Sequence, residues 1–320
     1  MPTAVGGIHH ITALASDPQK NVDFYTGVLG LRLVKTTVNF DAPDVYHLYY
    51  GDEVGQPGTI LTFFPFPDAV RGKRGTGEIS AVAFLAPRLS LDFWAGHLSR
   101  HGIRIDGPVS RFGEQYISFG DPEDMQIELV FAGGGEGGGR HWEGSPIPRE
   151  NALTRIGGVT LTLRESDPTE ELLAGTLGFR PAGRDGVRLR FNTGQGAAES
   201  AIDIVTSPDT HRGRQSAGSV HHIAWRTPTG EEQREWRLKI REAGLFVTEV
   251  LDRNYFQSIY FREPGEVLFE IATDPPGFSV DETPADLGTQ LKLPSWLEPD
   301  RARIERVLPP LRHRGAHPGR

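Results

Sequence analysis

The 320-residue sequence predicts an α+β protein built from four copies of one βαβββ module. Two pairs of related segments lead to this prediction, because repeats along a chain determine its architecture. Residues 7–32 and 156–180 each combine a short strand pattern, the tripeptide Ser-Asp-Pro and an amphipathic segment ending in Leu-Gly. Residues 77–102 and 218–244 each combine a strand with a helix that stops at Gly. A strand followed by a helix is therefore predicted four times.

The helices and the strands after them have local signals. Ser or Asp before Pro favours a helix start, because the side chain caps free amides and Pro suits the first turn. Gly30 and Gly178 stand where a helix would end in a left-handed residue. Residues 32–65 supply three further strands, and residues 115–131 and 257–273 each supply two strands joined by an Asp-Pro or Glu-Pro turn.

These elements divide the chain into four stretches. Residues 1–133 and 154–275 each hold a pair of βαβββ modules. The Gly-rich stretch between them, at 134–153, is interpreted as a linker. Residues 276–320 form a C-terminal tail with a short amphipathic helix at 300–308.

Composition excludes several classes of protein. Cysteine is absent, so disulfides, thiolate metal sites and a cysteine nucleophile are excluded, and any metal must be held by nitrogen and oxygen. The net charge of −8 argues against a nucleic-acid partner. No apolar run is long enough to cross a membrane, and the N-terminus carries no secretory pattern. We therefore expect a soluble, cytoplasmic protein.

Two histidine doublets mark the candidate site. His9-His10 and His221-His222 stand at equivalent repeat positions, and Glu270 ends the last strand of the fourth module. Two histidines and one carboxylate make a set that binds iron and leaves coordination positions for substrate and oxygen. Glu270 lies in the apolar run LFEIA, where a carboxylate is costly to bury without a cation.

The other modules lack this set. The four residues at the first-strand position are His10, Ala81, Gly158 and His222. Those at the last-strand position are Phe63, Glu128, a residue near Asp203, and Glu270. The second and third modules therefore cannot bind iron tightly, and Glu128 is expected to pair with an Arg or to face water. One metal ion per chain is predicted.

Strand alternation limits each doublet to one ligand. Neighbouring side chains on a strand point to opposite faces, so only one histidine of each pair can reach a shared cavity. The polarity of the two faces does not decide which one. His47, in the strand pattern VYHLYY, is interpreted as a structural residue.

Six segments resemble one known superfamily. They are GIHHIT, VYHLYYGDEVGQPGT, RFGEQYISFGDP, SVHHIAW, DRNYFQSIYFREPGEVLFEIATDPPGF and DLGTQLKLP. The chain resembles the vicinal oxygen chelate (glyoxalase/extradiol) superfamily, and within it the hydroquinone and chlorohydroquinone ring-cleaving dioxygenases. The resemblance implies modules paired into two glyoxalase-like domains, with the first module beside the fourth. It also selects the second histidine of each doublet, so that His10, His222 and Glu270 hold Fe(II), with Mn(II) as the alternative.

The resemblance extends to residues around the metal. Tyr260 and Arg253 match positions that line the substrate site, where a phenol and a guanidinium suit an anionic substrate. Tyr260 and Arg253 are therefore catalytic candidates, together with His9 and His221 as supporting residues. The residues expected to contact substrate are Thr12, Phe63 and Trp225.

The implied activity is an Fe(II)-dependent, non-haem dioxygenase that opens a dihydroxylated aromatic ring of the hydroquinone type. Its partners are a small aromatic diol and O2, and association into a homo-oligomer is left open. One alternative is a catechol-type extradiol dioxygenase. A second is a glyoxalase-like isomerase or thiol transferase, although Phe63 at the fourth ligand position argues against the larger ligand set of such enzymes. A protein that binds ligands without turnover would not need the three ligands.

Overall fold

The computed structural model of the chain describes residues 2–132, 138–193 and 199–312, and it contains the four βαβββ modules. The first comprises β1 (Ile8–Ala15), α1 (Pro18–Gly27), β2 (Arg32–Asn39), β3 (Ala42–Gly51) and β4 (Ile60–Pro65). The second comprises β5 (Glu78–Pro87), α2 (Leu91–Arg100), β6 (Asp106–Arg111), β7 (Glu114–Gly120) and β8 (Gln126–Ala132). The third comprises β9 (Arg155–Leu163), α3 (Asp167–Glu171) with a π-helical turn (Leu172–Thr176), β10 (Arg180–Asp185), β11 (Arg188–Asn192) and β12 (Ala201–Thr206). The fourth comprises β13 (Val220–Thr227), α4 (Gly230–Glu242), β14 (Leu251–Asp252), β15 (Gln257–Arg262) and β16 (Leu268–Thr273).

The predicted helix signals act as expected at α1. The Asp17 carboxylate accepts hydrogen bonds from the backbone N–H groups of Gln19 and Lys20, which satisfies two free donors of the first turn. Gly30 and Gly178 have φ angles of 71° and 73°, a region that side chains with a Cβ disfavour. The chain can therefore turn sharply from each helix into the next strand.

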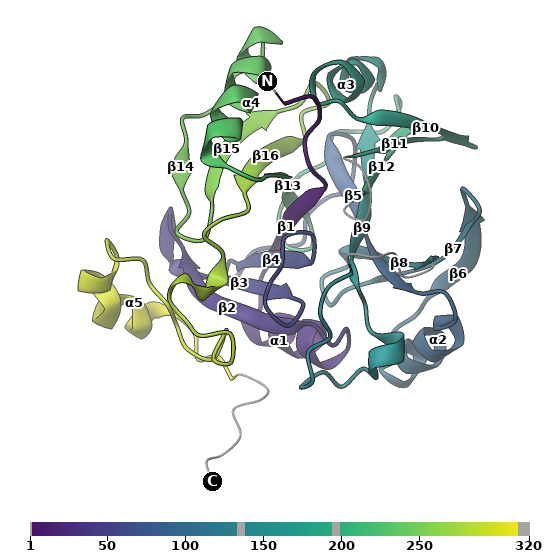
Figure 1. Ribbon diagram of the computed structural model, residues 1–320. Coiled ribbons are helices and arrows are strands. Elements are labelled where there is room, and N and C mark those ends of the chain that lie inside the picture. The colour runs from purple at the N-terminus through teal and green to yellow at the C-terminus, as the bar shows by residue number, and fades with distance from the viewer. Residues whose placement is uncertain (1, 133–137, 194–198, 313–320) are drawn as a thin grey trace.

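The strands form two eight-stranded sheets, and each sheet combines modules from distant parts of the chain. The first sheet has the order β14-β15-β16-β13-β1-β4-β3-β2, so it joins the first module to the fourth. The second has the order β10-β11-β12-β9-β5-β8-β7-β6 and joins the second module to the third. Figure 1 shows purple and green strands in one curved sheet and blue and teal strands in the other. The fold class of paired modules is confirmed, and residues 1–133 and 154–275 each contribute to both sheets.

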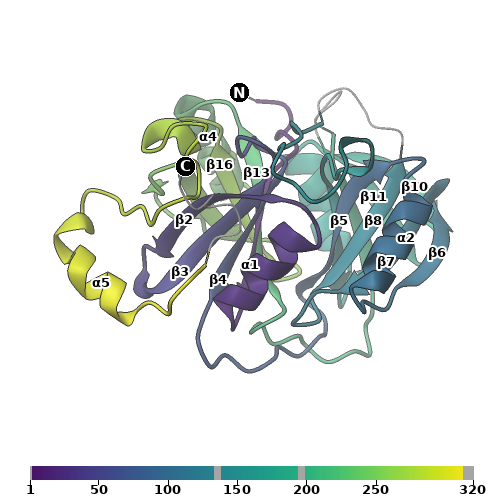
Figure 2. The ribbon, with the colours of Figure 1, turned by 90° about the horizontal axis from the view of Figure 1, so that it is seen from below.

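Each sheet buries one face beneath helices and curves around the other. Figure 2 shows α1 lying against the first sheet and α2 against the second. Fully buried Trp94 and Trp236 anchor α2 and α4 in the apolar core. The opposite, concave face of each sheet is left to line a cleft, and this face positions the candidate site.

A C-terminal strap, which we define as residues 276–292, packs across β2. The buried Lys35 ammonium pairs with the carboxylates of Asp281 and Glu282. The Arg32 guanidinium donates hydrogen bonds to backbone carbonyls within residues 284–287 of the strap. The strap is therefore part of the folded domain.

Beyond the strap lies the short helix α5 (Arg301–Val307), close to the range 300–308 expected from the sequence. Of the predicted linker at 134–153, residues 134–137 lie outside the described residues. Within the described parts of the chain, no helix has both the length and the apolar character needed to span a membrane.

Candidate metal centre

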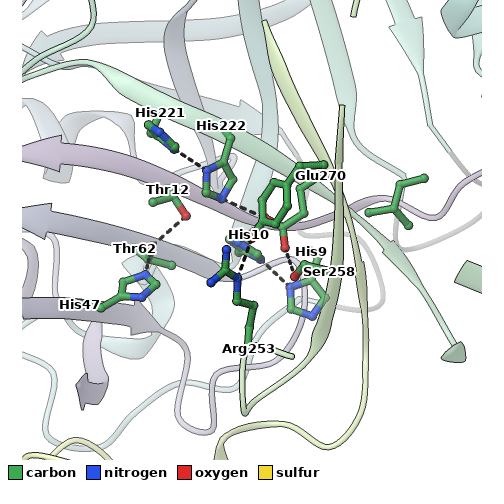
Figure 3. A network of polar contacts seen from close by, with 12 residues as sticks. His9, His10, Thr12, His47, Thr62, His221, His222, Arg253, Ser258 and Glu270 are labelled. Atoms are coloured by element: carbon green, nitrogen blue, oxygen red, sulfur yellow. Dashed lines mark hydrogen bonds and ion pairs between the residues drawn. The ribbon is translucent and has the colours of Figure 1, made fainter. Parts of the chain in front are cut away.

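Three buried side chains converge between β1, β13 and β16. The ligand atoms of His10, His222 and Glu270 all lie within 4.8 Å of one another. Glu270 Oε2 is 2.9 Å from His222 Nε2 and 3.4 Å from His10 Nε2. Figure 3 shows the two imidazoles and the carboxylate pointing toward one another. Across the described residues, this is the one group of at least three such side chains with ligand atoms this close.

Strand register brings the three residues together. Ala224 on β13 pairs with His10 on one side and with Glu270 on the other, so these three residues form a row across adjacent strands. His222 lies two residues before Ala224, on the same face, and pairs with Thr12. The pairing of β1 with β13 thus places residues separated by most of the chain around one point.

Each histidine doublet lies at a β-bulge. Between β1 and β13 the register slips at His9 and again at His221, so that each is the extra residue of a bulge. A bulge interrupts alternation and re-aims side chains. His221 consequently lines the same cavity as His222, and the prediction that only one histidine of each pair can reach the cavity is wrong for this doublet. His9 lies behind His10, against the ring of Phe256.

The bulges create two matching histidine pairs. His9 Nδ1 lies 2.9 Å from His10 Nδ1, and His221 Nδ1 lies 2.7 Å from His222 Nδ1. Each pair can share only one proton along this contact. The Nε2 atoms of His10 and His222 are left facing Glu270.

The donor set fits a metal ion. His222 Nε2 and Glu270 Oε2 are buried, and neither has a partner aligned as a hydrogen bond despite their 2.9 Å separation. Burial alone would raise the pKa of Glu270, but the His10 and His222 imidazoles overcome it and hold that pKa well below its usual range. Burial lowers the pKa of His222, although Glu270 partly opposes this shift. A carboxylate oxygen and imidazole nitrogens are the ligands of non-haem iron.

A cavity of about 430 Å³ opens beside these ligands. Arg253, Tyr260 and His221 all line it. Arg253 Nε lies 3.4 Å from the Tyr260 hydroxyl, and its guanidinium lies over the Tyr260 ring at 5.5 Å. At the mouth, Arg253 also forms an ion pair of 3.1 Å with Asp41. A cation and a phenol therefore face the same space as the candidate metal ligands.

Phe63 does not reach this cavity. Its ring is fully buried on the opposite face of β4, where it packs against Tyr25 and Tyr50 beneath α1. Thr62 occupies the position equivalent to Glu270 and faces the cleft. The prediction that Phe63 contacts substrate and fills the fourth ligand position is wrong, because the strand is shifted by one residue from the alignment expected from sequence.

Trp225 is also directed away from the cavity. Its fully buried ring packs edge to face against Phe179 and Phe269 in the core. This placement contradicts the prediction of a substrate contact, since Trp225 lies on the core face of β13. Thr12, by contrast, lines the cavity.

Sequence reasoning missed a polar cluster in the cavity wall. His47 Nε2 lies 2.8 Å from Thr62 Oγ1, and His47 Nδ1 lies 2.8 Å from the Tyr49 hydroxyl. Both His47 and Tyr49 line the cavity. The spacing of His47 and Tyr49 by two residues indicates that they share one strand face, and this was the available signal. The sequence could not show Thr62 as the partner of His47, because Thr62 lies on another strand.

Two further residues around the ligands were missed. Ser258 donates a hydrogen bond to Glu270 Oε1, which leaves Oε2 for the imidazoles. The Phe256 ring packs against His10 at 4.9 Å between centroids. Both belong to a segment whose pattern resembles an ordinary strand and turn.

In the second sheet, arginines neutralise the carboxylates that correspond to Glu270. Arg111 pairs with Glu128 at 2.5 Å. An arginine partner was one of the two outcomes expected for that carboxylate, the other being exposure to water. Arg190 pairs with Asp203 at 2.7 Å. The cleft here holds only about 30 Å³.

The histidine positions of this sheet carry Ala81 and Gly158. A Cβ atom on Gly158 would lie 2.5 Å from the Ala201 carbonyl oxygen, so the backbone leaves no room for a side chain. Both the sequence and the backbone packing therefore prevent this cleft from holding the histidine ligands found in the first sheet.

Comparison with known proteins agrees with this architecture. A sequence profile of the Glyoxalase/Bleomycin resistance protein/Dioxygenase superfamily matches residues 7–129 and 156–271. The crystal structure of an inferred dioxygenase from Bacillus subtilis strain 168 superposes with a TM-score of 0.92 at 44% identity, covering 98% of this chain and 99% of that chain.

Two curated relatives match almost end to end. MhqO of Bacillus subtilis (strain 168) is 45% identical over 304 residues, which cover 95% of this chain and 96% of MhqO. Its name gives it an inferred ring-cleaving dioxygenase activity. Chlorohydroquinone/hydroquinone 1,2-dioxygenase of Sphingobium indicum is 36% identical over 315 residues, covering 96% of this chain and 97% of the relative. At the level of enzyme class, the expected ring-cleaving oxidoreductase is confirmed. The chain belongs to the Glyoxalase/Bleomycin resistance protein/Dioxygenase superfamily.

Proposed function

We propose that this chain is an Fe(II)-dependent dioxygenase that opens a hydroquinone-type aromatic ring with O2. The observation that carries the proposal is the buried set of His10, His222 and Glu270 at the base of a cavity of about 430 Å³. Its volume lies within the range of small-molecule sites. The name of the Sphingobium indicum relative supports a para-diol substrate.

The three ligands would bind Fe(II), with Mn(II) as the alternative, through His10 Nε2, His222 Nε2 and Glu270 Oε2. Bound iron of this type supplies open coordination positions for a substrate oxygen and for O2. Ser258 and the two paired histidines hold the ligands in place through hydrogen bonds. Their contribution is to orient the ligands before any substrate arrives.

The cavity walls suit an anionic phenolate. The Arg253 guanidinium, about one-fifth exposed, provides a positive charge beside the ligands. Burial raises the pKa of Tyr260, so its hydroxyl keeps its proton near neutral pH and can donate it to a substrate oxygen. Thr12 offers a second hydroxyl on the same side as His10. These groups would bind the diol, orient it and stabilise charge that develops on its oxygens.

His221 would act as a neutral donor at the edge of the site. Burial lowers the pKa of His221 to about 3, so its ring is uncharged near neutral pH. If His222 binds metal through Nε2, its Nδ1 proton is donated to His221 Nδ1. His221, which lines the cavity, then carries its own proton on Nε2.

A four-ligand isomerase site is not supported. Thr62 takes the position of a fourth ligand, and its hydroxyl is already engaged by His47 and Thr12. Neutral hydroxyls are weaker metal ligands than carboxylates, which leaves a three-ligand set.

The test uses the full chain reconstituted with Fe(II) without oxygen and then assayed in an oxygen electrode. Hydroquinone, chlorohydroquinone and catechol are compared, with Mn(II) and Zn(II) loading as parallel samples. We expect oxygen uptake with hydroquinones when iron is loaded and none with Zn(II). Faster uptake with catechol would replace the para-diol assignment with the catechol one. No uptake with any diol would overturn the proposed function.

A further inference from the structure

A buried chain of hydrogen bonds crosses the cavity wall from β3 through β4 to β1. The Tyr49 hydroxyl lies 2.8 Å from His47 Nδ1, and His47 Nε2 lies 2.8 Å from Thr62 Oγ1. Thr62 Oγ1 lies 2.9 Å from Thr12 Oγ1, where the chain ends beside the candidate metal ligands. Figure 3 shows this last part of the chain on the side of the site opposite Ser258.

The hydrogen bonds in this chain all point the same way, from Tyr49 toward Thr12. Thr62 donates its hydroxyl proton to Thr12, so it has no proton left for His47. His47 Nε2 must therefore be the donor to Thr62, and His47 Nδ1 must accept the proton of Tyr49. Burial raises the pKa of Tyr49 and lowers that of His47, which agrees with a protonated phenol and a neutral imidazole carrying one ring proton.

The end of the chain leaves one proton free. Thr12 Oγ1 accepts from Thr62, so its own proton must point elsewhere. No acceptor for that proton is found among the residues that the structure describes. Thr12 follows His10 by two residues on the same strand face, pairs with His222 across the sheet and lines the cavity. The Thr12 hydroxyl proton is therefore available to a group bound in this cavity.

The His47 ring is fixed in its plane by packing as well as by hydrogen bonds. Its centroid lies 3.9 Å from that of Tyr49 and 4.2 Å from that of Phe64. The side chain is 9% exposed, so water cannot easily replace its two partners. A buried imidazole held this way cannot rotate to reverse the donor direction without leaving a polar group unpaired.

We propose that His47 is a positioning residue that determines substrate specificity, because it holds the Thr12 hydroxyl as a hydrogen-bond donor into the cavity. The site would therefore favour an aromatic substrate that presents an oxygen acceptor beside the metal ligands. The inference rests on the proposed function, since it assigns a selection step to the same cavity. It concerns a residue that the sequence suggested was only structural.

The test is a double-mutant cycle on His47 and Thr12 in the iron-loaded full chain, with hydroquinone as substrate. We expect His47→Phe, which keeps an aromatic ring, and Thr12→Val each to raise KM by about 3- to 10-fold with kcat unchanged, as for one lost directed hydrogen bond. The double variant should be no worse than Thr12→Val alone, since both changes remove the same interaction. His47→Gln retains a donor near the Nε2 position and should restore a KM close to wild type.

A further variant and a spectroscopic measurement test the role of His47 even if His47→Phe misfolds or the enzyme does not turn over. Thr62→Val interrupts the same chain and should reproduce the KM effect of His47→Phe. In the full chain loaded with diamagnetic Zn(II), ¹⁵N spectra should show the His47 proton on Nε2. Additive KM effects in the cycle, or a proton on Nδ1, would overturn the inference. A wild-type chain that consumes no oxygen with any diol would overturn the proposed function instead, and the ¹⁵N measurement would still test His47.

Discussion

The Nδ1 atom of His221 lies 2.7 Å from the Nδ1 atom of His222, and this contact leaves Nε2 of His222 to face Glu270. His9 and His10 repeat the arrangement on the neighbouring strand at 2.9 Å. The first histidine of each doublet thus orients the second. A sequence pattern of two adjacent histidines therefore supplies a ligand and its support at once.

We predict that the supporting histidines control metal affinity. His221→Phe and His9→Phe should each weaken Fe(II) binding by about 10- to 100-fold, because the ligand imidazole loses the partner that fixes its tautomer. Competition with a coloured chelator would measure the change. His221→Asn, whose amide oxygen can accept at the Nδ1 position, should recover much of the affinity. Equal loss in the Asn and Phe variants would show that the hydrogen bond is not responsible.

Removal of a ligand should have a larger effect. His222→Ala is expected to abolish both bound iron and oxygen uptake, because two remaining ligands hold Fe(II) weakly. Iron content is measured by elemental analysis after anaerobic reconstitution. Normal iron content in this variant would remove His222 from the ligand set.

The second sheet should contribute no metal. Glu128→Gln is expected to leave iron stoichiometry at its wild-type value, because Arg111 already pairs with that carboxylate and none of the described histidines lines its cleft. The same elemental analysis checks this. Loss of a bound metal in this variant would contradict the assignment of one site per chain.

Acid should destabilise the metal-free protein below about pH 6.5. Burial lowers the pKa of four histidines, namely His9, His47, His221 and His222. An unfolded histidine titrates near pH 6.5. As the pH falls below this value, the unfolded state therefore binds more protons than the folded state does. The free energy of unfolding should then fall by up to about 1.4 kcal/mol per pH unit for each such group.

Urea unfolding at several pH values between 7 and 5 would measure this slope. His47→Phe should be less stable at pH 7, but its stability should depend less steeply on pH, because one such histidine is gone. An unchanged slope in this variant would contradict the assignment of His47 as a buried neutral group.

The C-terminal strap should contribute to stability through Lys35. Lys35→Met leaves the buried Glu282 carboxylate without its partner, and this should cost about 3–5 kcal/mol in the free energy of unfolding. Adding Glu282→Gln should recover part of that loss, since the uncompensated charge is removed. Urea unfolding at neutral pH measures both variants. A loss below about 1 kcal/mol, typical of exposed ion pairs, would show that the strap is held by other contacts.

The sequence alone determined the four-module repeat and narrowed the candidate ligands to two histidine doublets and Glu270, while the choice within each doublet came from the family resemblance. Local patterns suffice for these features, because helix caps, strand alternation and matching repeat positions are encoded within a few residues of one another. The His-His doublets and Glu270 are identified this way, as is the lack of histidines at Ala81 and Gly158.

Only the tertiary structure decided which side chains share the cavity. Bulges at His9 and His221 and the register of β4 depend on pairing between distant strands. Alternation therefore failed at His221, and the repeat alignment was one residue off at Phe63. His47 was interpreted as structural because its link to the site runs through Thr62 on β4, which in turn bonds Thr12 on β1. A shift of one residue in register moves a side chain from the core to the site, and that register is set by long-range packing rather than by local sequence.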